Sequence, residues 1–357
     1  MNNRICGSLM VSSLMASSLM ALAVVIAVVA LAPVPVAGEG GQTPSPTAKP
    51  TAAARTWTPP RTPWGHPDLQ GIWNNSTLTP LERSQELAGK EFLTEQEAAE
   101  FEEELLHRTN ADRRDGAGTD TDLARAYNNL WYDRGTIVAT RRTSLIVDPP
   151  DGRLPPLTPE AQKRLAARPR SQRSGGPADS WEDRSLAERC IIYRGVPAFP
   201  TGYNNNYQIV QTPQSVAILQ ESIHDVRMIP LDGRPHVGQN IRQWLGDARG
   251  RWDGTTLVVE TTNFSERALI RNFNGQVSEA LHVVERFTRV SPDMIDYQFT
   301  VTDPKTWTRP WSGSLPLTSI EGPIFEYACH EGNYGMMNLL AVARAEEKAA
   351  EEAAKKR

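Results

Sequence analysis

The chain lacks the short motifs by which many nucleophilic and cofactor-dependent enzymes are recognised. Its six histidines include no His-Glu-x-x-His pair, and it has no Gly-x-Ser-x-Gly elbow, phosphate-binding glycine loop or dinucleotide fingerprint. These absences argue against serine hydrolases of the α/β type and against nucleotide-dependent enzymes. We therefore expect no cofactor and no metal.

Positive charge is not concentrated anywhere along the chain. The 38 Lys and Arg residues are offset by 42 Asp and Glu residues, giving a formal net charge of -4, and no basic stretch is long enough to neutralise many phosphates. Nucleic acid is therefore not expected as a partner. Proline (27), glycine (25) and tryptophan (9) are well represented, which favours short strands joined by turns over a helical bundle.

Only the N-terminus carries a long hydrophobic run. After Arg4, no charged side chain occurs in residues 7–32, and small residues follow at 36–38. A short basic start, an apolar core and a small-residue exit are typical of a secretory signal peptide. An uncleaved membrane anchor is the alternative, because the run is long for a signal. We expect a periplasmic or secreted protein that touches a membrane only through an uncleaved signal.

Composition divides the chain into five parts. We expect a signal peptide at 1–38, a flexible Pro/Thr/Ala-rich linker at 39–62, a helical and hairpin region at 63–189, a β-barrel-like domain at 190–340 and a charged helical tail at 341–357. The linker has almost no large apolar side chains, so it cannot bury enough surface to offset the entropy of ordering it. The folded part therefore begins near residue 63.

The C-terminal half alternates between strands and turns. In residues 294–302 the side chains of Ile295, Tyr297, Phe299 and Val301 face one way and polar side chains face the other, which is typical of a half-buried antiparallel strand. A long meander must close or stack to protect its edges. The sequence therefore predicts a mainly β (α+β) fold, an antiparallel meander that forms a barrel or strongly curved sheet, with short N-terminal helices.

Cysteine usage predicts one cross-link. Cys6 lies inside the signal, so Cys190 and Cys329 remain in the exported chain. Two cysteines in an oxidising compartment usually pair. We expect a Cys190–Cys329 disulfide, with two buried free thiols as the alternative.

Several phrases spread over the chain resemble one family. They are WGHPDLQGIW at 64–73, TPLER at 79–83, SLIVDPPDGR at 144–153, YNNNYQIVQT at 203–212, GRWDGTTLVVETTNF at 250–264 and EYACHEGNY at 326–334. The family is one of secreted, largely uncharacterised proteins from environmental bacteria. The resemblance implies export and a β-rich fold, and it carries no catalytic assignment.

The strongest candidate site is the segment that follows Cys329. His330, Glu331, Asn333 and Tyr334 place an imidazole, a carboxylate, an amide and a phenol within a few residues, beside the expected disulfide. A histidine next to a carboxylate suits acid–base chemistry near neutral pH. The alternative is that these groups satisfy buried backbone where two chain segments cross.

A second candidate lies at His224, Asp225 and Arg227. If these residues form a strand, Asp225 and Arg227 share a face and pair, while His224 points the other way. Arg227 then either serves in a structural ion pair or holds a substrate carboxylate or hydroxyl.

Two further groups of polar residues have open interpretations. Tyr203, Asn204 and Asn205 form either a turn or a set of ligands for a hydroxyl-rich molecule. Glu260 is a candidate acid if its strand face lines a lumen, and a solvated carboxylate if that face is exposed.

Together these features predict an exported protein with a small-molecule pocket. The first hypothesis is a cofactor-independent hydrolase, lyase or isomerase that applies His/Glu acid–base chemistry to a small organic or carbohydrate-like substrate. The alternative is a non-catalytic, lipocalin-like binding protein for an apolar or glycosidic ligand. The expected catalytic residues are His330, Glu331, His224 and Asp225, and the expected binding residues are Arg227, Tyr203, Asn204, Asn205, Asn333, Tyr334 and Glu260. The oligomeric state is left open.

Overall fold

A computed structural model of the protein describes residues 57–113, 118–119, 128–167, 179–265 and 277–356, apart from the side chain of His224. The expected signal peptide and the linker as far as residue 56 lie outside the described residues. Residues 57–62 belong to the folded unit, since Arg61 bridges to Pro67 and Thr62 is buried. None of the helices in the described ranges combines the length and apolarity that crossing a bilayer requires.

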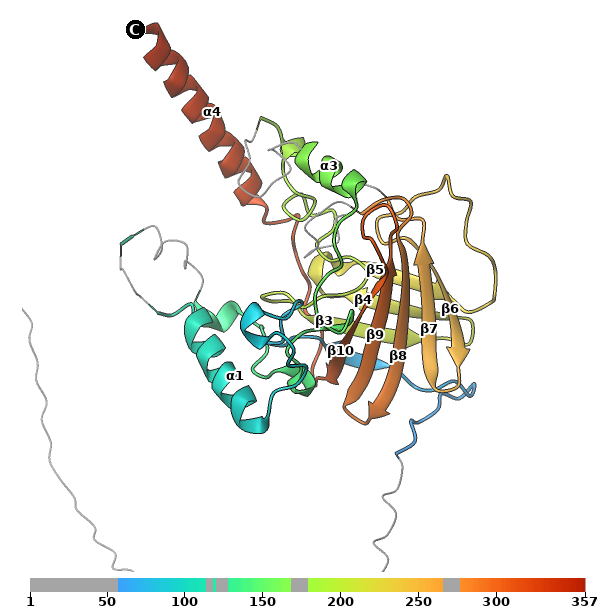
Figure 1. Cartoon of the computed structure of the whole chain (residues 1–357). Coiled ribbons are helices and arrows are strands. Elements are labelled where there is room, and N and C mark those ends of the chain that lie inside the picture. Colours follow the sequence, from blue (N-terminus) through green and yellow to red (C-terminus); the bar gives the residue numbers. More distant parts are fainter. Residues whose placement is uncertain (1–56, 114–117, 120–127, 168–178, 266–276, 357) are drawn as a thin grey trace, which may run out of the picture. The chain divides into compact units, whose positions relative to one another are not determined.

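One ten-stranded sheet dominates the fold (Figure 1). Its strands are β1 (Gly71–Asn74), β2 (Ile146–Asp148), β3 (Asn206–Gln211), β4 (Ser215–Gln220), β5 (Val226–Pro230), β6 (Asp247–Asp253), β7 (Thr256–Thr262), β8 (His282–Ser291), β9 (Met294–Thr302) and β10 (Trp311–Ser319). Among the described residues, the helices are α1 (Glu95–Thr109), α3 (Pro159–Ala167) and α4 (Tyr334–Lys355), with short 3-10 helices η1 (Gln85–Leu87), η2 (Asn129–Trp131), η3 (Ala139–Arg141), η5 (Trp181–Asp183) and η6 (Ser222–His224).

The sheet consists of two antiparallel meanders joined by β1. The strand order is β5-β4-β3-β1-β10-β9-β8-β7-β6, with β2 pairing on β10. β1 comes from the region expected to lie outside the barrel, and its Trp73 faces Tyr207 of β3 on one side and Ser319 of β10 on the other. The outcome is a mainly β fold with a nearly closed barrel, as the sequence predicts.

The barrel closes where its two end strands meet. In the described part of the chain, β5 and β6 lie in contact without being neighbours in the hydrogen-bonded ladder. Gly250 of β6 makes this contact close: a Cβ there would lie 2.7 Å from side-chain carbons of Ile229 and Leu231. A glycine is therefore required where the two edges approach.

The interior is packed with the side chains that the period-two pattern predicts. Ile295, Tyr297, Phe299 and Val301 of β9 are all buried, and β10 adds Trp311 to the same core. A capping box starts α1, because Thr94 Oγ1 accepts from the backbone N–H of Glu97 at 3.2 Å and the Glu97 carboxylate accepts from the backbone N–H of Thr94.

Replacing Gly313 of β10 with alanine is expected to lower the free energy of unfolding by about 1–3 kcal/mol, as overpacking a core does. The new Cβ would lie 2.2 Å from Phe299 Cζ, in a ring that already packs edge-on against Trp311. Urea denaturation measures the change. Gly332→Ala is the matched control, because a Cβ there meets nothing within 4 Å; equal losses in both variants would rule out the Phe299 contact as the cause.

The expected disulfide is present. Cys190 and Cys329 are joined with their Cα atoms 5.8 Å apart and 139 positions between them in sequence. The bond links the loop ahead of β3 to the segment that follows β10. It therefore restricts the unfolded chain over a long loop.

Replacing Cys190 and Cys329 together with alanine is expected to lower the free energy of unfolding by about 2–4 kcal/mol, the usual contribution of such a cross-link. Urea denaturation of the double variant and of the wild type held in excess dithiothreitol should agree. A double variant as stable as the oxidised wild type would contradict the expectation.

Candidate active site at the barrel rim

The segment that the sequence favoured most lies on the surface. His330 and Glu331 are exposed, and Tyr334 at the start of α4 is 70% exposed. None of the three lines the barrel-interior cavity, the cleft at the barrel rim or the groove beside the disulfide, whereas Asn333 and Tyr203 both line that groove. His330 and Glu331 therefore do not share a wall of these three spaces with the binding residues expected to work with them.

The second candidate group, His224, Asp225 and Arg227, is arranged differently from the expectation. η6 ends at His224, whose side chain lies outside what is described, and β5 begins only at Val226, so no strand alternation relates Asp225 to Arg227. Arg227 points into the barrel and pairs with Glu285 of β8. The expected Asp225–Arg227 pair is therefore replaced by a buried Arg227–Glu285 pair.

The consecutive asparagines build a turn. Asn204 has a φ of 55°, and its carbonyl oxygen accepts from the Arg194 guanidinium. Asn205 is fully buried, and its amide donates to the carbonyl of Thr201 at 3.0 Å and accepts from the N–H of Thr201 at 2.9 Å. Because backbone groups occupy this amide, the turn interpretation holds for Asn205.

Glu260 lies on the outer face of the barrel. Its neighbours Val259 and Thr261 point inward, and its own carboxylate pairs with Arg251 at 2.8 Å, with side-chain exposures of 60% for Arg251 and 40% for Glu260. The exposed-face alternative is therefore correct, and Glu260 is not a lumen carboxylate.

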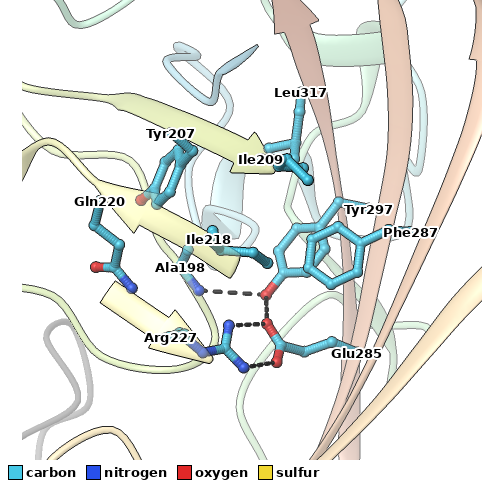
Figure 2. A pocket seen from close by; sticks show the side chains of 10 residues that line it. All are labelled: Ala198, Tyr207, Ile209, Ile218, Gln220, Arg227, Glu285, Phe287, Tyr297 and Leu317. Atoms are coloured by element: carbon cyan, nitrogen blue, oxygen red, sulfur yellow. Dashed lines mark hydrogen bonds and ion pairs between the residues drawn. The ribbon is translucent and has the colours of Figure 1, made fainter. Parts of the chain in front are cut away.

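A carboxylate that the sequence analysis did not single out occupies the barrel interior (Figure 2). Glu285 Oε1 and Oε2 accept from Arg227 Nη1 and Nη2 at 3.0 and 2.5 Å, and the Tyr297 hydroxyl donates to Oε1 at 2.8 Å. The N–H of Ala198 donates to the Tyr297 oxygen at 3.3 Å. The two-pronged pairing satisfies both charges inside an apolar core.

Tyr297 and Arg227 of the interior network keep their protonation states over a wide pH range. Burial and the nearby Glu285 charge raise the pKa of Tyr297 well above its ordinary value. Burial works against the Arg227 cation, but Glu285 outweighs it and raises the pKa of Arg227. Tyr297 therefore acts as a neutral hydrogen-bond donor and Arg227 as a permanent cation.

The space beside this network is small. The cavity bounded by Arg227, Glu285, Tyr297 and their apolar neighbours measures about 20 Å³, which holds about one water molecule. An organic ligand does not fit in the barrel interior as it stands.

A larger cleft lies at the rim of the barrel, where β6 begins, β7 ends and β8 begins. Its volume is about 620 Å³, within the range of roughly 300–1,000 Å³ that suits small organic molecules. It is lined by Pro235, His236, Val237, Gln239, Arg242, Thr262, Asn263, Glu279, Ala280, Leu281 and His282. Both imidazoles in this lining lie outside the residues that the sequence analysis named.

His236 is oriented by a buried carboxylate. Its Nδ1 lies 2.9 Å from Asp247 Oδ2, and the two side chains are 27% and 7% exposed. Asp247 also accepts from the N–H of Val237 at 3.0 Å and from Arg249 at 2.7 Å. Because an ionised carboxylate only accepts hydrogen bonds, Nδ1 carries the imidazole proton and Nε2 is left as the basic nitrogen.

The contacts of Asp247 set its charge. Burial opposes ionisation of Asp247. Hydrogen bonds from the backbone N–H of Val237 and from the side chains of His236 and Arg249 outweigh burial, so the pKa of Asp247 lies below its ordinary value. Asp247 is therefore an anion throughout the neutral range and holds His236 in one tautomer.

The pH dependence of stability follows from this pKa. Because the pKa of Asp247 is lowered by folding, its ionisation stabilises the fold above the unfolded value of about 3.9, and this stabilisation is lost as pH falls through the lower folded value. Asp247→Asn is expected to be less stable than the wild type at about pH 7, with the gap closing toward about pH 2. Urea denaturation at several pH values measures the gap, and a constant gap would contradict the expectation.

The loop that carries His236 is fixed from β7. Asn263 adopts a φ of 57°, and its amide donates to the carbonyls of Val237, Gly238 and Ile241 at 3.0 to 3.1 Å. The side chain is nearly buried, so it links the rim of the barrel to the base of the loop. The position of His236 therefore depends on the sheet and not on the loop alone.

The other charged groups of the cleft leave positive charge uncompensated. Glu279 pairs with Lys305, whose hydrogen bond lowers the pKa of that carboxyl, and Asp247 pairs with Arg249. Within the described ranges, Arg242 donates to the backbone carbonyl of Glu279 at 2.9 Å and has no ion pair with a carboxylate. The guanidinium of Arg242 is therefore available to an anionic or polar group in the cleft.

The described side chains offer no evident metal site. No group of three or more His, Cys, Asp or Glu side chains within the described part of the chain is placed to hold a metal ion.

The sequence contained a weak signal for this site. His236 follows the Asp232-Gly233 turn, and Asp247 opens a strand eleven positions later. Nothing in that spacing shows that the connection folds back so that the two side chains meet. Comparisons with known proteins add no assignment, because no family model, no curated protein and no solved structure matches this chain.

Proposed function

We propose that this protein is an exported enzyme that uses His236 and Asp247 for acid–base chemistry on a small polar organic substrate, without an organic cofactor. The observation that carries the proposal is the 2.9 Å contact between His236 Nδ1 and Asp247 Oδ2 at the wall of a cleft of about 620 Å³. The reaction class stays as the sequence suggested. The proposed catalytic residue is now His236, positioned by Asp247, in place of His330, Glu331, His224 and Asp225.

Hydrolysis of a small ester illustrates the chemistry that this arrangement supports. Nε2 of His236 takes a proton from water as the water oxygen bonds to the carbonyl carbon and the C=O electron pair moves onto oxygen. The imidazolium, stabilised by Asp247, then returns the proton to the leaving alkoxide as the C–O bond breaks. Arg242 supplies positive charge near the developing oxyanion.

The barrel interior offers less support for a lipocalin-like binding protein. Its cavity of about 20 Å³ holds about one water molecule. Export rests on the Cys190–Cys329 disulfide, which persists in oxidising compartments, and on the signal-like N-terminal run.

The proposal is tested by a turnover screen on the full chain. The substrates are p-nitrophenyl acetate and butyrate, small lactones and p-nitrophenyl glycosides, each assayed with wild type and His236→Gln. We expect saturable turnover of one class in the wild type and its loss in the variant. Turnover that survives in the variant, or no turnover of any class, would count against His236 as the catalytic base.

A further inference from the structure

A second groove of different character lies beside the disulfide. Its volume is about 680 Å³, again within the roughly 300–1,000 Å³ of small-molecule sites. One side comes from residues 187–203 and the other from residues 326–333, and Cys190–Cys329 joins the two sides. The groove is separate from the rim cleft, since the two share no lining residue.

Tyrosine rings form part of its wall. The rings of Tyr193 and Tyr203 lie nearly parallel, with an interplanar angle of 13° and centroids 6.4 Å apart. Tyr327 lies on the opposite wall of the groove. Arg194 fixes the loop below them, because its guanidinium donates to the carbonyl of Tyr203 at 2.9 Å and to Thr201 Oγ1 at 2.7 Å. The aromatic face is therefore held by a buried cation and not left to a free loop.

The charged groups in the lining are all acidic. Glu188 and Glu326 line the groove, and no Lys, Arg or His does. Glu188 is already paired with Arg184 at 2.5 Å, whereas Glu326 has no hydrogen bond or ion pair among the described residues. The lining of the groove therefore offers the Glu326 carboxylate to a ligand, opposite in sign to the guanidinium of the rim cleft.

We propose that this groove binds a small organic cation, an amine or a quaternary ammonium compound. Tyrosine faces attract cations through their ring quadrupoles. Glu326 adds a carboxylate that a cation can pair with. A neutral ligand of the same shape gains from neither interaction.

The disulfide makes the site sensitive to its redox state. Besides Cys329, the Asn333 amide joins the segment between β10 and α4 to the opposite wall, because it donates to the carbonyl of Glu188 at 2.9 Å and lies 3.6 Å from Cys190 Sγ. Reduction by an external dithiol converts Cys190–Cys329 to two thiols and yields the oxidised, cyclic dithiol reagent. The two walls then lose their covalent link and keep only non-covalent contacts, so we expect the groove to lose its shape.

The test compares choline with its neutral isostere 3,3-dimethyl-1-butanol by isothermal titration calorimetry on the full chain. We expect choline to bind at least about 10-fold more tightly, a difference of about 1.4 kcal/mol. Glu326→Gln and Tyr203→Ala should each weaken choline binding by about 3–10-fold or more, and Tyr203→Phe should retain it. Dithiothreitol should abolish the binding.

Glu331→Gln is the matched control, because Glu331 is exposed, lies near Glu326 in sequence and does not line the groove. Equal affinity for choline and the alcohol would overturn the proposal, and so would choline binding unchanged in Glu326→Gln and Tyr203→Ala. Selective binding of glucose, added as a third probe, would overturn it in favour of a hydroxyl-rich ligand. Circular dichroism confirms that each variant is folded.

Discussion

Replacing Glu285 with glutamine is expected to lower the free energy of unfolding by about 3–5 kcal/mol, the usual cost of removing one partner from a buried ion pair. Arg227 is almost completely buried and would keep its charge, because a guanidinium is not deprotonated in proteins. No other carboxylate lines the interior cavity to compensate that charge. The Tyr297 hydroxyl, which donates to Glu285 at 2.8 Å, would then face a neutral amide. The loss arises from an uncompensated cation in an apolar core.

Urea denaturation of Glu285→Gln measures this loss, and Glu260→Gln is its matched control. Glu260 also pairs with an arginine of the same barrel, Arg251, at 2.8 Å, but on the outer face. Exposed pairs contribute only about 0.2–1 kcal/mol. Similar losses in the two variants would show that burial does not set the strength of the Arg227–Glu285 pair.

Removing both charges should cost less than removing one. The double variant Arg227→Met with Glu285→Leu leaves no buried charge, and replacing a buried ion pair with apolar residues is often neutral or stabilising. We expect a coupling energy of about 2–3 kcal/mol between the two positions in a double-mutant cycle. Additive effects would mean that the two side chains do not depend on one another.

The barrel could be predicted from sequence because its signals are local. The alternation in β9, the turn between β6 and β7 and the turn between β8 and β9 are each contained in a few consecutive residues. Short connections bring consecutive strands together as antiparallel neighbours. β1 was not expected in the sheet, because four residues carry too little alternation to reveal a strand.

The sequence contains one sign of the buried Arg227–Glu285 pair. Val283, Glu285 and Phe287 share a face by period two, so a carboxylate sits in an otherwise apolar phase of β8. That pattern marks Glu285 as buried and in need of a partner. It does not identify Arg227, which lies 58 positions earlier and meets Glu285 only because the barrel closes.

The candidate site depends on the same closure. His236 lies in a connection without regular structure, and Asn263 holds that connection from the end of β7. The pattern of residue types along a strand does not show which loop the residues at the end of that strand will contact. His330 and Glu331 were favoured for their proximity in sequence, which does not ensure that their side chains converge on a cavity.

Replacing His236 with glutamine is expected to lower kcat/KM by about 10²–10⁴-fold for the substrate class found in the screen, the usual contribution of a general base. Glutamine keeps a hydrogen-bonding side chain of similar reach but cannot take up a proton at neutral pH. Steady-state kinetics with wild type and variant measures the ratio. His107→Gln, on the exposed side of α1, is the control for non-specific imidazole catalysis and should keep full activity.

Asp247→Asn is expected to lower kcat/KM within the same range of about 10²–10⁴-fold, although Asp247 does not touch the substrate. An amide can donate to Nδ1, which would place the imidazole proton on Nε2 and remove the basic nitrogen from the substrate side. KM should change little, because the binding walls of the cleft are intact. A variant that loses affinity but keeps kcat would show that Asp247 only maintains the shape of the cleft.

Added imidazole separates catalysis from structure. The space left in His236→Ala opens onto a cleft of about 620 Å³, so free imidazole can enter and act as the base in place of the missing ring. We expect imidazole to restore part of the activity of His236→Ala in a saturable manner, and to restore less in the double variant that also carries Asp247→Asn. Restoration that is equal in both backgrounds would mean that Asp247 does not orient the base, and none in either would place the proton transfer elsewhere.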